Sequence, residues 1–142
     1  AWVPEKSRPR FLERLAADRD GRAGGQPPGV TPAAIPGSET AEWAEAVDKD
    51  GTYGNEITIR SLDLLRGYEP ISFMTRIAPT PLLMIVADQD TQTPVAWQGE
   101  AFEMAGHPKK LVTLSGRHYD PYTLLLEESR QAALDWFQEH LK

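Results

Sequence analysis

The stretch that decides the fold is "TPLLMIVADQDTQTP", which runs from Thr80 to Pro94. Its first half is a continuous apolar run that ends at an acidic turn, a pattern typical of a strand buried on both faces. Thr93 and the proline after it then predict the start of a helix, with Thr93 as the N-cap residue. We expect this helix to run to about Ala105 and to end at Gly106.

A second stretch, "KLVTLSGRHYDPY" from Lys110 to Tyr122, begins with a shorter predicted strand. A long helix is then predicted from Thr123 to Leu141, with an apolar stripe made of Leu126, Ala133, Phe137 and Leu141. Strand, helix, strand and helix with short connections predict a βαβα unit whose strands pair in parallel. Because parallel sheets usually have several strands covered by helices, we expect this pair to be the end of a larger sheet.

The first half of the chain shows weaker patterns. Residues 8–20 predict a short amphipathic helix. Residues 21–37 contain nine Gly or Pro and predict a loop. Ser38 is the expected N-cap of a helix over residues 39–47. Residues 56–66 fit either a strand or a helix, and the spacing of the leucines favours the helix.

Composition and charge narrow the classes of function. The 142 residues are 40% hydrophobic and 25% charged, which is typical of one soluble globular domain. The net charge of −6 argues against binding to nucleic acid or to an anionic membrane, and we expect neither partner. The absence of cysteine agrees with a cytoplasmic location. Because the first residue is Ala1 and not Met, we expect the chain to be trimmed or part of a longer one.

Polar residues follow both predicted strands. Asp88 and Asp90 follow the first strand, and His118 follows the second. Carboxyl ends of adjacent parallel strands lie side by side, so a carboxylate and an imidazole are expected to meet there, as in the orienting half of a nucleophilic triad. Taken singly, a histidine after a strand is more often a surface or capping residue, and an aspartate there is usually a turn former. Their coincidence at matching strand ends strengthens the catalytic interpretation.

The two stretches resemble the last two strands of the α/β-hydrolase fold. "NEITIRSLDLLRGYEPISFMTRIAPTPLLMIVADQD", residues 55–90, is also similar to a branch of that family with dienelactone-hydrolase-like, acyl-peptidase-like and polyketide-transferase-like members. The resemblance covers residues 55–142 and implies the C-terminal strands and helices of such a domain. Residues 1–54, with the Gly- and Pro-rich loop, would form a cap-like helical segment.

The resemblance implies roles for individual residues. The acid of the family carries over to Asp90 and its base to His118, which follows "GR" in the expected turn, with Asp88 as the alternative acid. The family's Gly-x-Ser-x-Gly nucleophile motif is absent, since it fits none of Ser7, Ser38, Ser61, Ser72, Ser115 and Ser129. We therefore expect the nucleophile upstream of Ala1, and the chain alone to be inactive. A small-molecule acyl substrate is implied, without a metal or organic cofactor.

Three functions stay open at this point. The first is hydrolysis of an ester, lactone or amide, with an upstream polypeptide or a partner chain completing the sheet. The second is a non-catalytic fragment or interaction module that pairs through its open sheet edge. The third is acyl transfer on the same fold. A calcium loop at "DKDGTYGNE" is not expected, because Tyr53 stands where the loop needs Gly and Ile59 where it needs Glu.

Overall fold

The computed structural model describes residue 3 and residues 5–141, and it divides into two compact units that are considered separately. The first unit ends at Glu69 and the second begins at Pro70. Both strand-end turns identified in the sequence belong to the second unit. Among the helices formed by the described residues, none has the length and apolar character needed to cross a membrane.

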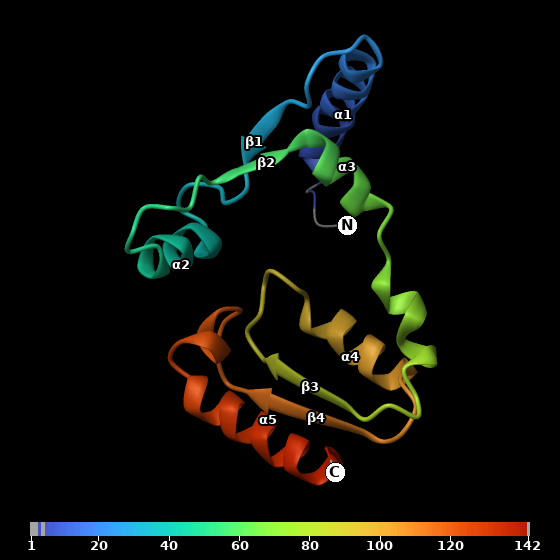
Figure 1. The fold of residues 1–142 in the computed structure, drawn as a ribbon, viewed down its shortest axis with the longest axis vertical. Helices are drawn as coiled ribbons and strands as arrows, with labels where there is room; N and C mark the ends of the chain where they lie inside the picture. The colour runs from blue at the N-terminus through green and yellow to red at the C-terminus, as the bar shows by residue number, and fades with distance from the viewer. Residues whose placement is uncertain (1–2, 4, 142) are drawn as a thin grey trace. The chain divides into compact units, whose positions relative to one another are not determined.

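The second unit is an α/β structure. In chain order its elements are η2 (Pro70–Arg76), β3 (Leu82–Ala87), α4 (Val95–Met104), β4 (Lys109–Leu114), η3 (Asp120–Tyr122) and α5 (Leu126–His140). β3 and β4 pair in parallel, with Leu82 opposite Lys109 and Ala87 opposite Leu114. α4 and α5 lie on opposite sides of the strand pair (Figure 1). The predicted βαβα unit is therefore confirmed.

The core of this unit is small. Val86, Ala87 and Leu114 are buried at the ends of the two strands, and Ala105 after α4 and the large side chain of Trp136 on α5 are buried as well. The other four residues of β3 are only partly covered. Within the described part of the chain, no third strand joins this sheet. β3 is therefore an apolar strand with one edge that has no strand beside it in this part of the chain.

The predicted apolar stripe of the last helix is wrong as a core-facing surface. Leu126, Phe137 and Leu141 are exposed, whereas Trp136 on a different side of α5 is buried. A pair of strands offers a narrow surface, and one large indole covers much of it, so the remaining apolar residues project beyond the strands. The helix also begins three residues later than predicted, because the backbone N–H of Thr123 closes the η3 turn by donating to Asp120.

The prediction that Thr93 caps the next helix is also wrong. α4 begins at Val95 without a side-chain cap. At the other end, the Lys109 ammonium lies 2.7 Å from the carbonyl oxygen of Phe102 and 3.2 Å from that of Glu103. The last turn of a helix leaves carbonyls without partners, and this cation satisfies two of them.

The first unit contains short elements. They are η1 (Glu5–Ser7), α1 (Arg8–Ala23), β1 (Val30–Pro32), α2 (Glu39–Val47), β2 (Glu56–Thr58) and α3 (Ile59–Arg66). β1 and β2 form an antiparallel pair. The prediction of a loop throughout residues 21–37 is wrong at residues 21–23, which belong to α1, and at β1. β1 depends on a partner strand about 26 residues further along the chain. Residues 56–66 hold both a strand and a helix. Ser38 caps α2 as predicted, accepting from the N–H of Ala41.

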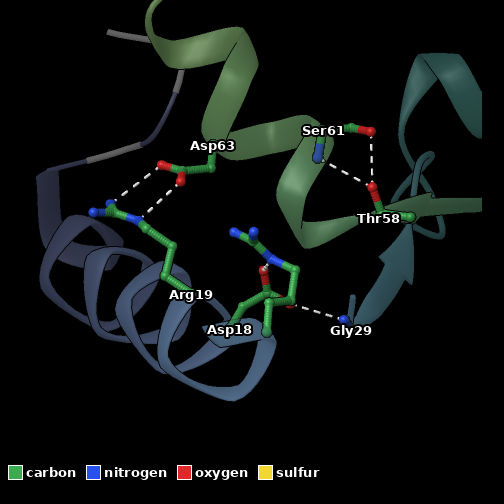
Figure 2. A network of polar contacts seen from close by, with 7 residues as sticks. Asp18, Arg19, Gly29, Thr58, Ser61 and Asp63 are labelled. Carbon is green, nitrogen blue, oxygen red and sulfur yellow. Dashed lines mark hydrogen bonds and ion pairs between the residues drawn. The ribbon is translucent and has the colours of Figure 1, made fainter. Parts of the chain in front are cut away.

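Polar contacts join α1 to α3 and to the residue before β1 (Figure 2). The Asp18 carboxylate accepts from the backbone N–H of Gly29, just before β1, and from Arg22, each at 2.8 Å. Hydrogen bonds from Arg22 and Gly29 hold the pKa of the Asp18 carboxyl below its usual range. Arg19 forms an ion pair with Asp63 of α3 at 2.9 Å. The Asp18 side chain is only 4% exposed, so this contact is the better shielded of the two.

Asp18→Asn tests the contact between the Asp18 carboxylate and the backbone N–H of Gly29. We expect the Gly29 amide proton to exchange with solvent roughly tenfold faster, because a neutral amide oxygen accepts more weakly than a carboxylate. Hydrogen-exchange NMR measures this directly. Asp20→Asn, an exposed acid of the same helix, is the matched control and should leave the Gly29 rate unchanged. Equal rates in the two variants would contradict the assignment.

Candidate active site

The two strand-end turns are bonded to one another. The backbone N–H of Asp88 donates to Leu114 at 2.9 Å, and that of Gln89 donates to Gly116 at 2.9 Å. The Asp88 carboxylate in turn accepts from the backbone N–H of Gly116 at 3.1 Å. The two backbone bonds extend the parallel ladder past the last paired residues, and the bond to the Asp88 carboxylate reinforces them. They fix the positions from which Asp90 and His118 leave the sheet.

Asp90 and His118 meet at this edge. The Asp90 Oδ2 atom lies 2.8 Å from the His118 Nδ1 atom. The Asp90 side chain is 6% exposed, and the His118 ring is 27% exposed. The acid is therefore buried beneath a ring that still reaches solvent. A catalytic histidine needs this combination, in which one ring nitrogen is held by the acid and the other side of the ring is accessible.

The Asp90 carboxylate accepts four hydrogen bonds. Its Oδ1 atom receives the backbone N–H groups of Gln92 and Thr93, each at 2.8 Å. Its Oδ2 atom receives His118 and, at 3.1 Å, the side-chain amide of Gln98. Burial raises the pKa of Asp90, but the hydrogen bonds from His118, Thr93 and Gln92 and the attraction to His118 outweigh it. The net result is a pKa below the usual range of an aspartate.

This ionised carboxylate fixes the tautomer of the imidazole. A carboxylate only accepts hydrogen bonds, so Nδ1 of His118 must carry the proton that lies between the two groups. Nε2 is then the nitrogen whose lone pair is available for proton transfer. The His118 ring also packs edge-to-face on Tyr119, with ring centroids 4.6 Å apart. Ring packing and the acid together define the orientation of the imidazole.

The alternative acid lies elsewhere. Asp88 is bonded to the backbone of Gly116, and no hydrogen bond joins it to His118 among the described residues. Asp120 holds the same turn from the other side, its carboxylate accepting from the backbone N–H of Arg117 at 2.7 Å. These two acids shape the turn that carries the histidine, and Asp90 is the acid that contacts it.

An open cleft of about 560 Å³ lies beside the pair. Its walls come from one face of β3 and from α5, and the residues are Leu83, Ile85, Ala87, Ser129, Arg130 and Ala133. Asp90 and His118 lie at the same cleft, together with Tyr122. The alternation of three β3 residues along the wall is the two-residue period of a strand. The cleft therefore joins an apolar wall to an acid and a base.

The serine that lines this cleft is engaged in structure. The Ser129 hydroxyl lies 2.6 Å from the carbonyl oxygen of Pro121 and 3.0 Å from that of Leu126. It holds the η3 turn against the first turn of α5. A hydroxyl committed to backbone carbonyls lacks the base contact that activates a nucleophile.

Sequence reasoning missed two residues of this arrangement. Gln98 follows three apolar residues at the start of α4, and a polar residue in that position was the signal that could have indicated a polar contact. Asp120 stands in an Asp-Pro pair, which indicates a turn, but the backbone group that it binds was not predictable from the pattern. Both act on main-chain or carboxylate atoms whose positions depend on tertiary packing.

Comparison with known proteins places this fold. No protein-family model matches the sequence. A polyketide transferase of Gibberella fujikuroi is 30% identical in an alignment 127 positions long, which covers 83% of this chain and 39% of that relative. The α/β hydrolase GrgF from Penicillium sp. sh18 is 26% identical, with a TM-score of 0.76 over 96% of this chain and 50% of GrgF.

Two further solved structures share the fold. DcsB, in a complex with its substrate analogue, has a TM-score of 0.74 at 19% identity, and it is matched over 97% of this chain and 52% of DcsB. A hypothetical protein from Pseudomonas aeruginosa has a TM-score of 0.70 at 24% identity, over 97% and 46% of the two chains. The chain thus has the fold of α/β hydrolases and spans about half the length of these structures. This agrees with the C-terminal portion expected from the order of its motifs.

Gly116→Ala tests the packing of the histidine turn. A Cβ atom at this position would lie 2.8 Å from Leu125 and 2.9 Å from Asp120. We expect the free energy of unfolding to fall by about 1–3 kcal/mol, the usual cost of overpacking. Urea denaturation measures it.

The control for this substitution is Gly99→Ala in α4. Apart from its chain neighbours and the adjacent helix backbone, no atom of the described residues lies within 4 Å of a Cβ placed there. Alanine should be neutral or stabilise the helix by up to about 1 kcal/mol. Equal stabilities of the two variants would show that the turn has room for a side chain.

Proposed function

We propose that this chain, on the α/β-hydrolase fold that it shares with its structural neighbours, supplies the acid and the base of a serine hydrolase. Asp90 is the acid and His118 is the base. The 2.8 Å contact between Asp90 Oδ2 and His118 Nδ1 is the observation that supports this assignment. The reaction is attack of a serine hydroxyl on the acyl carbon of an ester, lactone or amide.

Each residue has a defined task in this reaction. Nε2 of His118 takes the proton of the serine as its oxygen attacks the acyl carbon. Asp90 keeps the proton on Nδ1 and stabilises the imidazolium that forms. The imidazolium then returns the proton to the leaving group, and water completes the cycle by the same route. The buried carboxylate makes this stabilisation stronger than it would be in water.

The nucleophile belongs to the remainder of the fold in this proposal. The 142 residues contain no Gly-x-Ser-x-Gly motif. The solved structures that the chain matches are about twice its length. We infer that a further polypeptide, in the same chain or in a partner, carries the serine and continues the sheet beside β3. In the same proposal residues 1–54 are a cap-like helical segment and residues 55–142 belong to the catalytic domain.

His118→Ala and Asp90→Asn test the proposal in the full-length protein. Hydrolysis of p-nitrophenyl esters should fall by about 10³- to 10⁴-fold in both variants, because the base is lost or its tautomer is no longer fixed. Labelling of the nucleophile by a fluorophosphonate probe should fall with it. Both are measured on the same preparation.

Asp88→Asn is the matched control for Asp90→Asn. An asparagine oxygen can still accept from Gly116, so we expect activity within about threefold of the parent. A variant at Asp88 that is as damaged as the one at Asp90 would reassign the acid. Full activity of His118→Ala would remove the proposal altogether.

Acyl transfer is the second candidate, and the name of the Gibberella fujikuroi relative, a polyketide transferase, favours it. The same acid and base serve this reaction if an alcohol or amine replaces water in the second step.

Product analysis in the presence of a competing alcohol or amine separates the two reactions. The reference is the ratio of acyl-acceptor product to hydrolysis product that the same ester gives in solution without the enzyme. For a transferase, this ratio should rise about tenfold or more, which is the size of an ordinary binding preference. A hydrolase should give the solution ratio. Either result leaves the roles of Asp90 and His118 unchanged.

A further inference from the structure

A glutamine of α4 reaches back to the acid. The Gln98 side-chain nitrogen lies 3.1 Å from Asp90 Oδ2 and 2.7 Å from the carbonyl oxygen of Thr93. A primary amide carries two hydrogens, so this one nitrogen can donate to both oxygens at once. Gln98 is thus a bridge between the first turns of α4 and the loop that holds the acid.

The bridge completes the set of donors around the carboxylate. Oδ1 is held by two backbone groups of its own loop, those of Gln92 and Thr93. Oδ2, the atom that faces the imidazole, is held by His118 and Gln98. In the described part of the chain, Gln98 is the one side chain besides His118 that donates to Asp90. A carboxylate has about four sites for acceptance, and all of them are filled.

The charged groups in and near the cleft do not replace Gln98. Asp88 and Asp120 are bonded to the backbone of the histidine turn. Arg130 on α5 lines the cleft, and it is paired with Glu127 of the same helix. Without Gln98, the only remaining donor on Oδ2 would be the imidazole, which is the group that the acid has to orient.

We propose that Gln98 is a positioning residue, which fixes Oδ2 of Asp90 independently of His118 and thereby holds the imidazole in line for proton transfer. This inference rests on the proposed function for its kinetic consequence. Its structural consequence, a fixed Nδ1 proton on His118, exists whether or not the protein turns over an ester.

Gln98→Met in the full-length protein is the main test. Methionine keeps the length and the helix propensity of the side chain and removes the donors. We expect kcat for p-nitrophenyl esters to fall about tenfold with KM unchanged, since a hydrogen bond to a charged group is worth on the order of tenfold and acts here only on the transition state. We expect the His118 Nδ1 proton, observed by NMR, to exchange with water more rapidly.

Two further variants sharpen the result. Gln98→Glu keeps the shape but places a second carboxylate against Asp90, so its losses should exceed those of Gln98→Met. Gln131→Met is the matched control, because Gln131 donates to Asp135 on α5 in the same way, with no histidine in contact. It should leave kcat and the Nδ1 proton unchanged.

The outcomes are distinct. A lower kcat together with faster Nδ1 exchange supports the positioning role. An unchanged kcat in Gln98→Met, or a lower kcat with an unchanged Nδ1 proton, overturns it while His118→Ala remains inactive. If His118→Ala is fully active, the proposed function fails instead, and the Nδ1 exchange rate alone decides whether Gln98 orders the pair.

Discussion

Six residues of β3 lie opposite six residues of β4, and the two strands end together at Ala87 and Leu114. The acid–base pair depends on this register. Asp90 and His118 are separated by 28 residues of sequence, and the parallel pairing places their turns against one another. A slip of one residue would move the histidine turn along the sheet by about 3.3 Å, which exceeds the length of the bond between the two side chains.

The chemistry of the site follows from how the acid is held. A buried carboxylate is costly unless its oxygens are paired, and Asp90 meets this condition with donors from its own loop, from α4 and from the β4 turn. Asp90 therefore stays charged in a partly desolvated environment, where its electrostatic effect on the imidazole is strong. Three separate segments must fold correctly before that effect exists, so the electrostatics of the site depend on the folding of β3, α4 and β4 together.

Much of this unit could be predicted from local pattern. The continuous apolar run of β3, the shorter run of β4 and the two polar turns were sufficient to place an acid near His118, and the family resemblance selected Asp90 over Asp88. Residues whose role depends on a distant partner were not predictable. β1 is a strand because β2 lies beside it. The side of α5 that is buried is set by the packing of Trp136 and not by the helical periodicity of the apolar residues. The bond from Gln98 likewise depends on the angle at which α4 leaves the loop.

The two ends of the strand pair carry different features. The acid and the base gather at one end, whereas the connection from α4 into β4 lies at the other, where Leu82 donates to the carbonyl of Pro108. Changes in the length of that connection leave the register and the pair untouched as long as the ladder forms. Insertions, tags or new binding loops can therefore accumulate at the far end during evolution or engineering, while the end with the acid and the base tolerates almost no change in backbone length.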